Sequence, residues 1–299
     1  MAVHQKKSIV DCHVHSGDWN YPFLRNRSDL NVSDYWDSAP AEVGAAIFFP
    51  SDQKDNDLLL KNIQADNDEQ TYTRSYMAFW YDPYDLSSHN ILQQLDNELT
   101  MVEKAVESAF GTMQCNIEQC DYGIHSSVCP DDLQPSIYDL VVAIKVHAGI
   151  DRVMGGISNG VYSDAIRIAK RAGIPIIVHC GGWKDTSHHD YVVRAAYEHH
   201  DATFIAAHCG GKSDKDQIAA IDRFCDIDNV LVDISSVKYK YVLEHALKRL
   251  GPERIIFGSD WPIMSPFASI GALRDCCTEE LFNEVRKSSW KLINKLCTI

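Results

Sequence analysis

The sequence has no long hydrophobic run. No uninterrupted apolar stretch in its 299 residues approaches the roughly 20 residues that a membrane-spanning helix needs. The N-terminal segment Met-Ala-Val-His-Gln-Lys-Lys contains no apolar core of a secretory signal peptide. We therefore expect neither a membrane span nor a signal peptide, and we expect the ten cysteines to be thiols in a reducing, cytoplasmic setting.

Positive charge is also scarce. Lysine and arginine total 28 against 42 aspartate and glutamate residues, which gives a formal net charge of -14. A surface of this sign repels nucleic acid and anionic membranes, so neither is expected as a partner. The overall charge leaves room for a local basic pocket, and it is compatible with either a monomer or a homo-oligomer.

The motifs of several enzyme classes are missing as well. No phosphate-binding loop, dinucleotide fingerprint or serine nucleophile elbow occurs in a convincing strand–turn–helix context. Internal repeats and low-complexity segments are not evident either. Any chemistry must therefore come from side chains that the fold brings together.

Apolar strands alternate with amphipathic helices along the chain. The predicted strands cover residues 9–15, 44–50, 74–81, 140–147, 174–179, 203–208, 230–234 and 254–257. Strands that are continuously apolar are typical of a parallel sheet covered by helices. Eight strand–helix units in a chain of this length predict an α/β fold, the (β/α)8 TIM barrel, with a doubly wound open sheet as the alternative.

We expect residues 1–299 to form a single barrel domain with two loop insertions. Residues 16–43 are polar and aromatic, and are predicted to fold over the site as a long loop with a short helix. Residues 111–135 show no clean period and hold three cysteines and two prolines. The residues that determine the substrate specificity of barrel enzymes lie in such loops. Because these two segments show no regular pattern, the sequence does not predict the substrate.

Several predicted strands end in residues that bind metals. His13 and His15 are two apart at the end of the first strand, so their side chains project from the same face. His179, His208 and Asp260 end the fifth, sixth and eighth strands. A satisfied core histidine or a helix N-cap would explain each residue singly, but not the repetition. The pattern predicts a metal site at the carboxyl ends of the strands, where barrel enzymes have their active sites.

Four of these strand ends form motifs, which are Asp11-Cys-His-Val-His15, Val178-His-Cys-Gly181, Ala207-His-Cys-Gly-Gly211 and Phe257-Gly-Ser-Asp-Trp-Pro262. Together they resemble the amidohydrolase superfamily. They are most similar to its amidohydrolase-related branch (amidohydrolase 2), which includes aminocarboxymuconate-semialdehyde decarboxylase-like proteins. The resemblance covers nearly the whole chain in the right order, and it implies a TIM barrel of the metal-dependent hydrolase type.

The resemblance implies one divalent metal ion, with zinc favoured and manganese as the alternative. His13, His15, His179 and Asp260 would hold it. A water activated by the ion would be the nucleophile. Asp260 would take the proton of that water and deliver it to the leaving group, while His208 would hydrogen-bond the water or polarise the substrate carbonyl.

The fourth strand leaves two interpretations open. Lys145 and His147 share a face by the period of two and could bind a substrate carboxylate. Resemblance to the cyclic-amide branch instead implies a carbamylated Lys145 that bridges a binuclear centre, with His179 and His208 on the second ion. The first interpretation is favoured because the Ser-Asp-Trp-Pro and His-Cys-Gly-Gly motifs resemble the amidohydrolase-related branch more closely.

Three loop residues just beyond strand ends, Trp19, Arg152 and Trp183, are further candidates for substrate binding, with packing or solvation as the alternative. The predicted function is a metal-dependent hydrolase of a small, anionic ester, lactone or amide. The alternative is a metal-dependent non-oxidative decarboxylase (a lyase) of a small carboxylic acid. A barrel without catalysis would show an apolar residue in place of a ligand, and none of the predicted ligands is replaced in this way.

Overall fold

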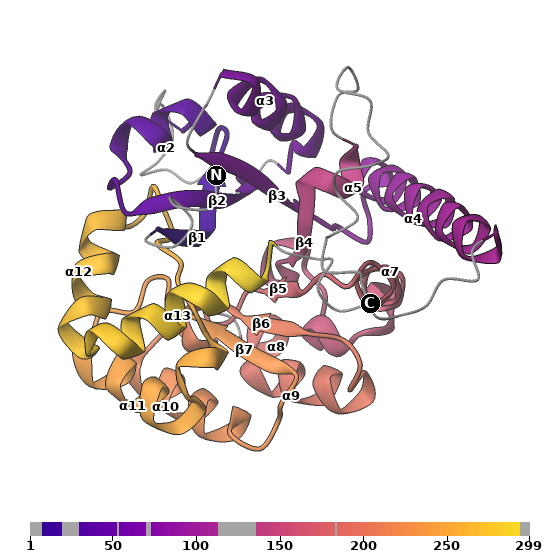
Figure 1. Ribbon diagram of the computed structural model, residues 1–299. Helices are drawn as coiled ribbons and strands as arrows, with labels where there is room; N and C mark the ends of the chain where they lie inside the picture. The colour runs from indigo at the N-terminus through magenta and orange to yellow at the C-terminus, as the bar shows by residue number, and fades with distance from the viewer. Residues whose placement is uncertain are drawn as a thin grey trace.

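Eight parallel strands form one sheet in which each strand pairs with the next along the chain (Figure 1). The computed structural model describes residues 8–19, 30–52, 54–69, 73–112, 136–182 and 184–293. The strands are β1 (Ile9–Ser16), β2 (Val43–Pro50), β3 (Arg74–Trp80), β4 (Val141–Val146), β5 (Ile176–Val178), β6 (Phe204–Ala206), β7 (Val230–Asp233) and β8 (Ile255–Ile256).

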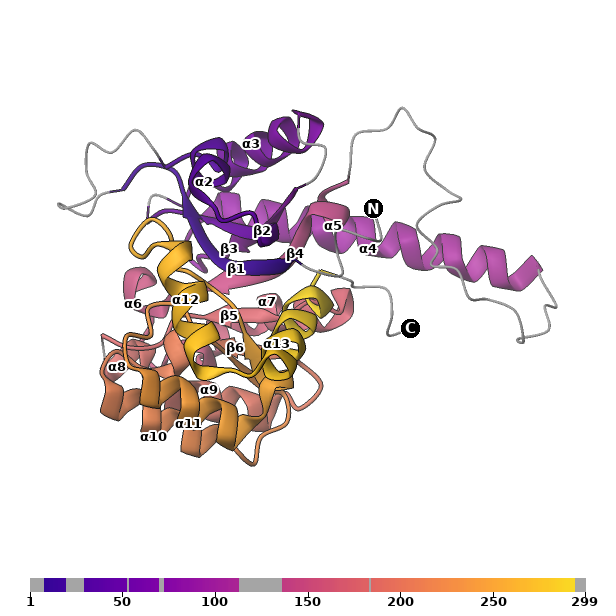
Figure 2. The same cartoon turned by 60° about the vertical axis from the view of Figure 1, so that its left-hand side comes forward.

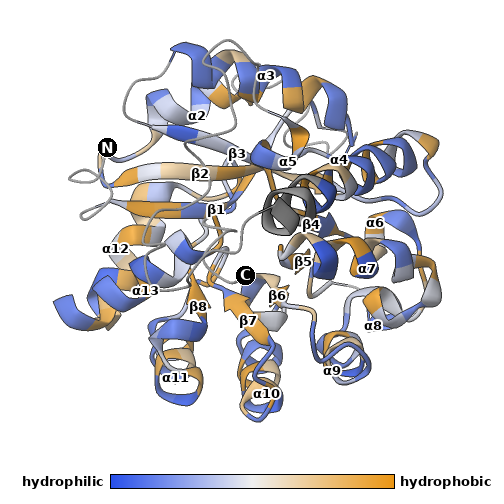
Figure 3. Cartoon of the chain, turned by 45° about the vertical axis from the view of Figure 1, so that its right-hand side comes forward, coloured by the Kyte–Doolittle hydropathy of each residue, from blue (hydrophilic) through white to orange (hydrophobic). Residues whose placement is uncertain are grey.

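Helices surround the ring of strands (Figure 3). The long helix α4 (Leu86–Thr112) extends beyond the ring (Figure 2). The others are α2 (Val32–Ser38), α3 (Asn56–Glu69), α5 (Ile137–Leu140), α6 (Ala148–Asp151), α7 (Ser163–Ala172), α8 (Lys184–Ser187), α9 (His189–Glu198), α10 (Asp214–Phe224), α11 (Lys240–Leu250), α12 (Pro266–Cys276) and α13 (Glu279–Lys291). Among the described residues, no helix has the length and apolar character needed to cross a membrane.

Backbone hydrogen bonds close the ring between β1 and the segment that follows β8. The N–H of Asp260 donates to the carbonyl of His13 at 2.8 Å. The N–H of His15 donates to the carbonyl of Trp261 at 2.9 Å. The predicted (β/α)8 barrel is confirmed, and the alternative of an open doubly wound sheet is wrong.

Apolar side chains fill the inside of the ring. One buried cluster contains Val10, Ala45, Ile47, Ala143, Ile177, Ile205 and Ile256. Side chains from strands on all sides of a ring contact one another only in its interior, so this cluster marks the inward face. Two residues after Ala143, the same face of β4 carries Lys145, and two residues after Ile177, directly beyond the end of β5, comes His179. The inward face therefore changes from apolar to polar toward the carboxyl ends of the strands.

The predicted elements are present with shifted ends. The strand predicted over residues 44–50 begins one residue earlier as β2, whereas the strand predicted over 254–257 is shortened to β8. The insertion over 16–43 contains a short helix, α2, as expected. Most of the second predicted insertion, residues 113–135, lies outside the described residues.

Arg254 joins the segment after α10 to β7. Its guanidinium group donates hydrogen bonds of 2.7 to 3.1 Å to the carbonyls of Phe224, Cys225, Ile227 and Val230. These carbonyls lie at the end of α10, in the turn that follows it and at the start of β7, where the regular backbone hydrogen bonds of a helix or sheet are incomplete. The interaction fixes the entry of the chain into β7, the strand that supplies Asp233 to the site.

We expect Arg254→Met to lower the free energy of unfolding by about 2–4 kcal/mol, because several carbonyls lose a charged donor at once. Urea denaturation followed by circular dichroism measures the loss. The control is Arg249→Met, which removes an exposed ion pair with Asp222 of 3.0 Å and should cost less than about 1 kcal/mol. Equal losses in the two variants would contradict this role of Arg254.

Candidate metal centre

A cavity of about 400 Å³ opens at the carboxyl ends of the strands. Six of the predicted site residues line it, and these are His15, Trp19, His147, His179, His208 and Asp260. His13 lies directly beneath, with no exposed surface. The structure therefore brings residues from β1, β4, β5, β6 and β8 to one place, as the pattern of strand ends predicts.

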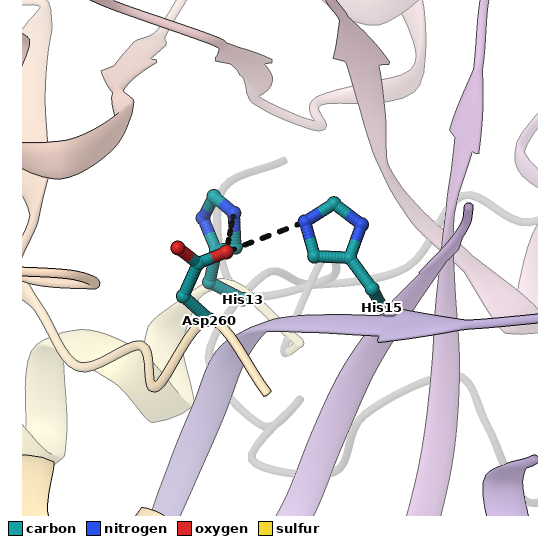
Figure 4. A group of neighbouring side chains, drawn as sticks. All are labelled: His13, His15 and Asp260. Carbon is teal, nitrogen blue, oxygen red and sulfur yellow. Dashed lines mark ion pairs between the residues drawn. The ribbon is translucent and has the colours of Figure 1, made fainter. Parts of the chain in front are cut away.

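His13, His15 and Asp260 form the centre of the site (Figure 4). Oδ1 of Asp260 lies 3.4 Å from Nε2 of His13 and 3.3 Å from Nε2 of His15. All three side chains are buried, and one ligand atom of each lies within 4.8 Å of the other two. Two imidazole nitrogens and a carboxylate oxygen at this spacing can hold one metal ion.

The backbone around Asp260 is shaped for this contact. Asp260 has a left-handed φ of 67°, and its N–H is held by the carbonyl of His13. A side chain at Gly258 would place Cβ 2.6 Å from Cβ of His13, so only glycine lets the closing segment pass this close. The hydroxyl of Ser236 donates to Oδ2 of Asp260, which leaves Oδ1 facing the two histidines.

Asp233 fixes the tautomer of His13. Its Oδ2 lies 2.8 Å from Nδ1 of His13, and an ionised carboxylate only accepts, so Nδ1 carries the proton. The lone pair of Nε2 then faces Asp260, and Nε2 has no hydrogen-bond partner within the described part of the chain. A lone pair opposed to a carboxylate in a buried site is unfavourable unless a cation lies between them. These residues therefore fit a metal ion, with Asp233 orienting one ligand.

Burial keeps both central histidines neutral. It lowers the pKa of His13 to about 4, although Asp233 opposes the shift. Burial also lowers the pKa of His15. For Asp260, burial favours the neutral acid, but the hydrogen bond from His15 and the neighbouring histidines hold its pKa below the usual range. Neutral imidazoles beside an ionised carboxylate are the protonation states that a metal ion requires.

His179 and His208 form a second pair in the same cavity. Nδ1 of His208 lies 2.9 Å from Oγ and 3.2 Å from the carbonyl oxygen of Ser235, and a carbonyl only accepts, so this nitrogen carries a proton. Nε2 of His208 lies 3.3 Å from Nδ1 of His179. In a neutral His208, Nε2 accepts from His179, which leaves the lone pair of His179 on its own Nε2. His179 is not part of the three-residue cluster but borders it through His208.

Lys145 lies beneath the cavity and does not line it. Its side chain has no exposed surface, and Nζ lies 4.5 Å from the centre of the Phe49 ring. Nζ has no hydrogen-bond partner among the described residues. Burial lowers the pKa of Lys145 to about 8, against the opposing charges of Asp233 and Asp260. The amine is therefore a charge close to the centre rather than a contact for a ligand in the cavity.

His147 lies on the cavity wall on the same face of β4. Its Nδ1 accepts the N–H of Ile150 at 3.2 Å, at the start of α6. Burial and the charge of Lys145 hold the pKa of His147 well below its usual range. The imidazole is therefore neutral with its proton on Nε2, so it would bind a substrate carboxylate as a hydrogen-bond donor and not through a positive charge.

Of the three loop residues predicted to bind substrate, one lines the cavity, one does not, and one lies outside the described residues. Trp19 lines the cavity, with its ring centre 4.8 Å from that of His15. Arg152 is exposed and does not line the cavity. Trp183 lies outside the described residues.

Several site residues were not predicted from the sequence. Ser235 lies within hydrogen-bond distance of both His13 and His208. It lies two residues after Asp233, and this spacing, which also identified His13 and His15, could have indicated that the two side chains share a face. Lys212 and Lys238 line the mouth of the cavity. Both lysines lie in irregular loops, where no periodicity predicts the direction of a side chain.

In a comparison with protein families, residues 141–285 match a family model described as amidohydrolase. No curated protein sequence matches the chain. The matched region runs from β4 to α13 and includes His179, His208 and Asp260.

Solved structures match over nearly the whole chain. A 5-carboxyvanillate decarboxylase from Sphingomonas paucimobilis has a TM-score of 0.62 at 9% identity, covering 97% of this chain and 99% of that chain. A putative 2-pyrone-4,6-dicarboxylic acid hydrolase from Pseudomonas putida has a TM-score of 0.59 at 12% identity, covering 97% and 98%. A Burkholderia multivorans amidohydrolase with bound zinc has a TM-score of 0.58 at 12% identity, covering 97% and 99%. At these identities the likeness establishes the fold alone.

We expect Asp233→Asn to weaken zinc binding by roughly 10–100-fold, because the amide no longer fixes His13 in the tautomer that leaves Nε2 free for an ion. Competition with a fluorescent chelator measures the dissociation constant. The control is Asp164→Asn, an exposed carboxylate on α7, which should bind zinc like the wild type. Unchanged affinity in Asp233→Asn would show that the pair does not orient a ligand.

Proposed function

We propose that this chain is a metal-dependent hydrolase of a small ester, lactone or amide, because its residues 141–285 match the amidohydrolase family model. The buried group of His13, His15 and Asp260 at the mouth of the barrel is the observation that carries the proposal. The family resemblance predicted from the strand motifs is confirmed. Solved structures of this fold include both hydrolases and decarboxylases.

The proposed ligands are His13, His15, His179 and Asp260. Zinc is the first candidate and manganese the second, since nitrogen and oxygen ligands suit either ion, and the Burkholderia neighbour contains zinc. When bound, such an ion lowers the pKa of water toward neutrality and polarises a carbonyl group. The alternative is a binuclear centre bridged by a carbamylated Lys145, whose buried amine has a lowered pKa.

Asp260 is the proposed proton carrier. Its Oδ1 faces the central histidines, while Oδ2 accepts from Ser236 and lies 4.0 Å from Nδ1 of His208. As an ionised carboxylate, Asp260 takes the proton of the attacking water and delivers it to the leaving group. His208 orients that water or polarises the substrate carbonyl, and Ser235 holds its imidazole in place for this role.

The substrate is proposed to be a small organic anion. Lys212 and Lys238 line the cavity without an ion-pair partner among the described residues, and Asp260 is the only described acidic residue in the lining. Trp19 and Trp80 add aromatic surface to the wall. In a chain of net charge -14, this is a local basic pocket that attracts anions.

A metal-dependent non-oxidative decarboxylase is the second candidate. The same two lysines could hold a leaving carboxylate, and a decarboxylase of this fold is among the solved structures. Hydrolysis of an ester or lactone releases a proton at neutral pH, whereas decarboxylation releases carbon dioxide. A screen of lactones and esters against hydroxybenzoates, with both products monitored, separates the two reactions.

We expect the purified protein to contain about one zinc or manganese ion per chain, because a catalytic site of this type holds a single ion with one position open. Elemental analysis by mass spectrometry measures the content. Removal of the ion with a chelator should abolish turnover, and added zinc should restore it. A metal-free protein that gains no activity from divalent ions would contradict the proposed function.

We expect Asp260→Asn to lower kcat by roughly 10²–10⁴-fold while the fold is retained, since an amide cannot carry the proton. Steady-state kinetics on a substrate found in the screen measures the effect. The control is Asp275→Asn, which changes an exposed carboxylate of α12 and should leave kcat unchanged. Near-native turnover in Asp260→Asn would show that another group moves the proton.

A further inference from the structure

Four side chains from separate segments form a stack that leads to the candidate centre. Nζ of Lys54 lies 5.9 Å from the centre of the Trp80 ring. The rings of Trp80 and His147 are parallel to within 1°, with centres 5.5 Å apart. His147 stacks in turn on His179, with centres 3.7 Å apart and an interplanar angle of 10°. We call these four residues the ring stack, and its last member is a proposed metal ligand.

Trp80 is held at both its backbone and its ring. Its N–H donates to Oδ1 of Asn56 at 2.8 Å, and its carbonyl accepts from Nδ2 of Asn56 at 2.9 Å. Its indole Nε1–H donates to Oδ1 of Asp151 at 3.2 Å. The backbone of Trp80 is thus held by Asn56 and its indole by Asp151, and in this position the indole lies parallel to the ring of His147.

Lys54 forms an ion pair with Asp151, whose carboxylate accepts the indole N–H of Trp80. Its Nζ lies 2.9 Å from Oδ1 of Asp151 and 2.5 Å from Oδ2 of Asp82. The side chain of Asp151 is fully buried, and burial raises its pKa to about 6 although Lys54 opposes the shift. Without the lysine, the carboxylate would lose its charge or move toward water, and Trp80 would lose a charged acceptor.

The orientation of the Trp80 indole affects His147 and His179 because the three rings are stacked. His147 cannot turn freely, since its Nδ1 accepts the N–H of Ile150 at 3.2 Å. At a centre separation of 3.7 Å, no space remains between His147 and His179, so a displaced ring must displace the next. His179 in turn places its Nδ1 3.3 Å from Nε2 of His208.

We propose that Lys54 and Trp80 are positioning residues for the candidate centre. The ion pair with Asp151 fixes the indole, and the indole and His147 hold the imidazole of His179 in the plane in which it can bind an ion. The inference rests on the proposed function in its last step only, which is the binding of an ion by His179.

Two variants test the ring stack at different points. Lys54→Met removes the counter-ion, and Trp80→Phe keeps an aromatic ring but removes the N–H that donates to Asp151. The control is Lys170→Met, which breaks an ion pair of 2.6 Å with Asp201 far from the ring stack. In metal-free protein with labelled histidine, the ring signals of His147 and His179 should move in both test variants and stay in place in the control.

Zinc affinity is measured on the same proteins by chelator competition. We expect the dissociation constant to rise about tenfold in Lys54→Met and Trp80→Phe, as for other residues that orient a metal ligand, and to be unchanged in Lys170→Met. Unfolding midpoints are recorded in parallel. If Lys54→Met does not fold, Asp151→Asn removes the buried charge but keeps an acceptor for Trp80, and the same shifts are expected.

Wild-type histidine signals together with wild-type zinc affinity in the test variants would overturn the inference. Moved histidine signals with unchanged zinc affinity would also overturn it, since His179 would then bind no ion or need no support. A wild-type protein that binds no zinc would end the proposed function, and the histidine signals would still decide whether Lys54 and Trp80 set the rings. The two failures are therefore distinguishable.

Discussion

The hydrogen bonds that join β1 to the segment after β8 are the contacts on which the site depends. They bring Asp260, which follows the last strand, beside His13 on the first strand. Asp11 strengthens the same junction, because its carboxylate accepts the N–H of Ser259 at 2.9 Å and that of His13 at 3.3 Å. The hydroxyl of Tyr35 also donates to Asp11, at 2.8 Å, and ties α2 to this point. Without closure, the proposed ligands would lie on opposite edges of an open sheet.

The junction supports an unusual concentration of buried polar groups. Asp233, Asp260 and Lys145 all lie in the interior of the barrel, where an unpaired charge is costly. The pair of Asp233 with His13 satisfies one carboxylate, but Nε2 of His13 and Nζ of Lys145 have no hydrogen-bond partner in the described ranges. Groups of this kind mark functional sites, since stability alone would favour apolar residues there. A bound cation would offset this cost at His13 and Asp260, whereas the charge of Lys145 is supported by Asp233 and Asp260.

The sequence predicted the barrel and the centre of the site because both follow from regular periods. Apolar strands at repeated intervals indicated the ring, and the period of two along β1 placed His13 and His15 on one face. His179 and Asp260 followed, since parallel strands end at the same side of a barrel. These features need only local pattern and a single rule of topology.

The rest of the site depends on packing between distant segments, which no local pattern encodes. The sequence does not indicate the direction of Asp233, because β7 ends at this residue and the contact with His13 exists only once the ring is closed. Lys54 reaches Asp151 from a left-handed backbone position that periodicity does not indicate. Arg152 has a similar left-handed position at the end of α6, and its side chain is exposed rather than turned to the cavity.

The central claim is that residues from both ends of the ring hold one metal ion. Anomalous scattering at the zinc edge, from a crystal of protein supplied with zinc, tests this most directly. The account predicts a single strong peak about 2.0–2.2 Å from Nε2 of His13, Nε2 of His15 and a carboxylate oxygen of Asp260. No peak within reach of these three atoms, with zinc present in the crystal, would contradict it.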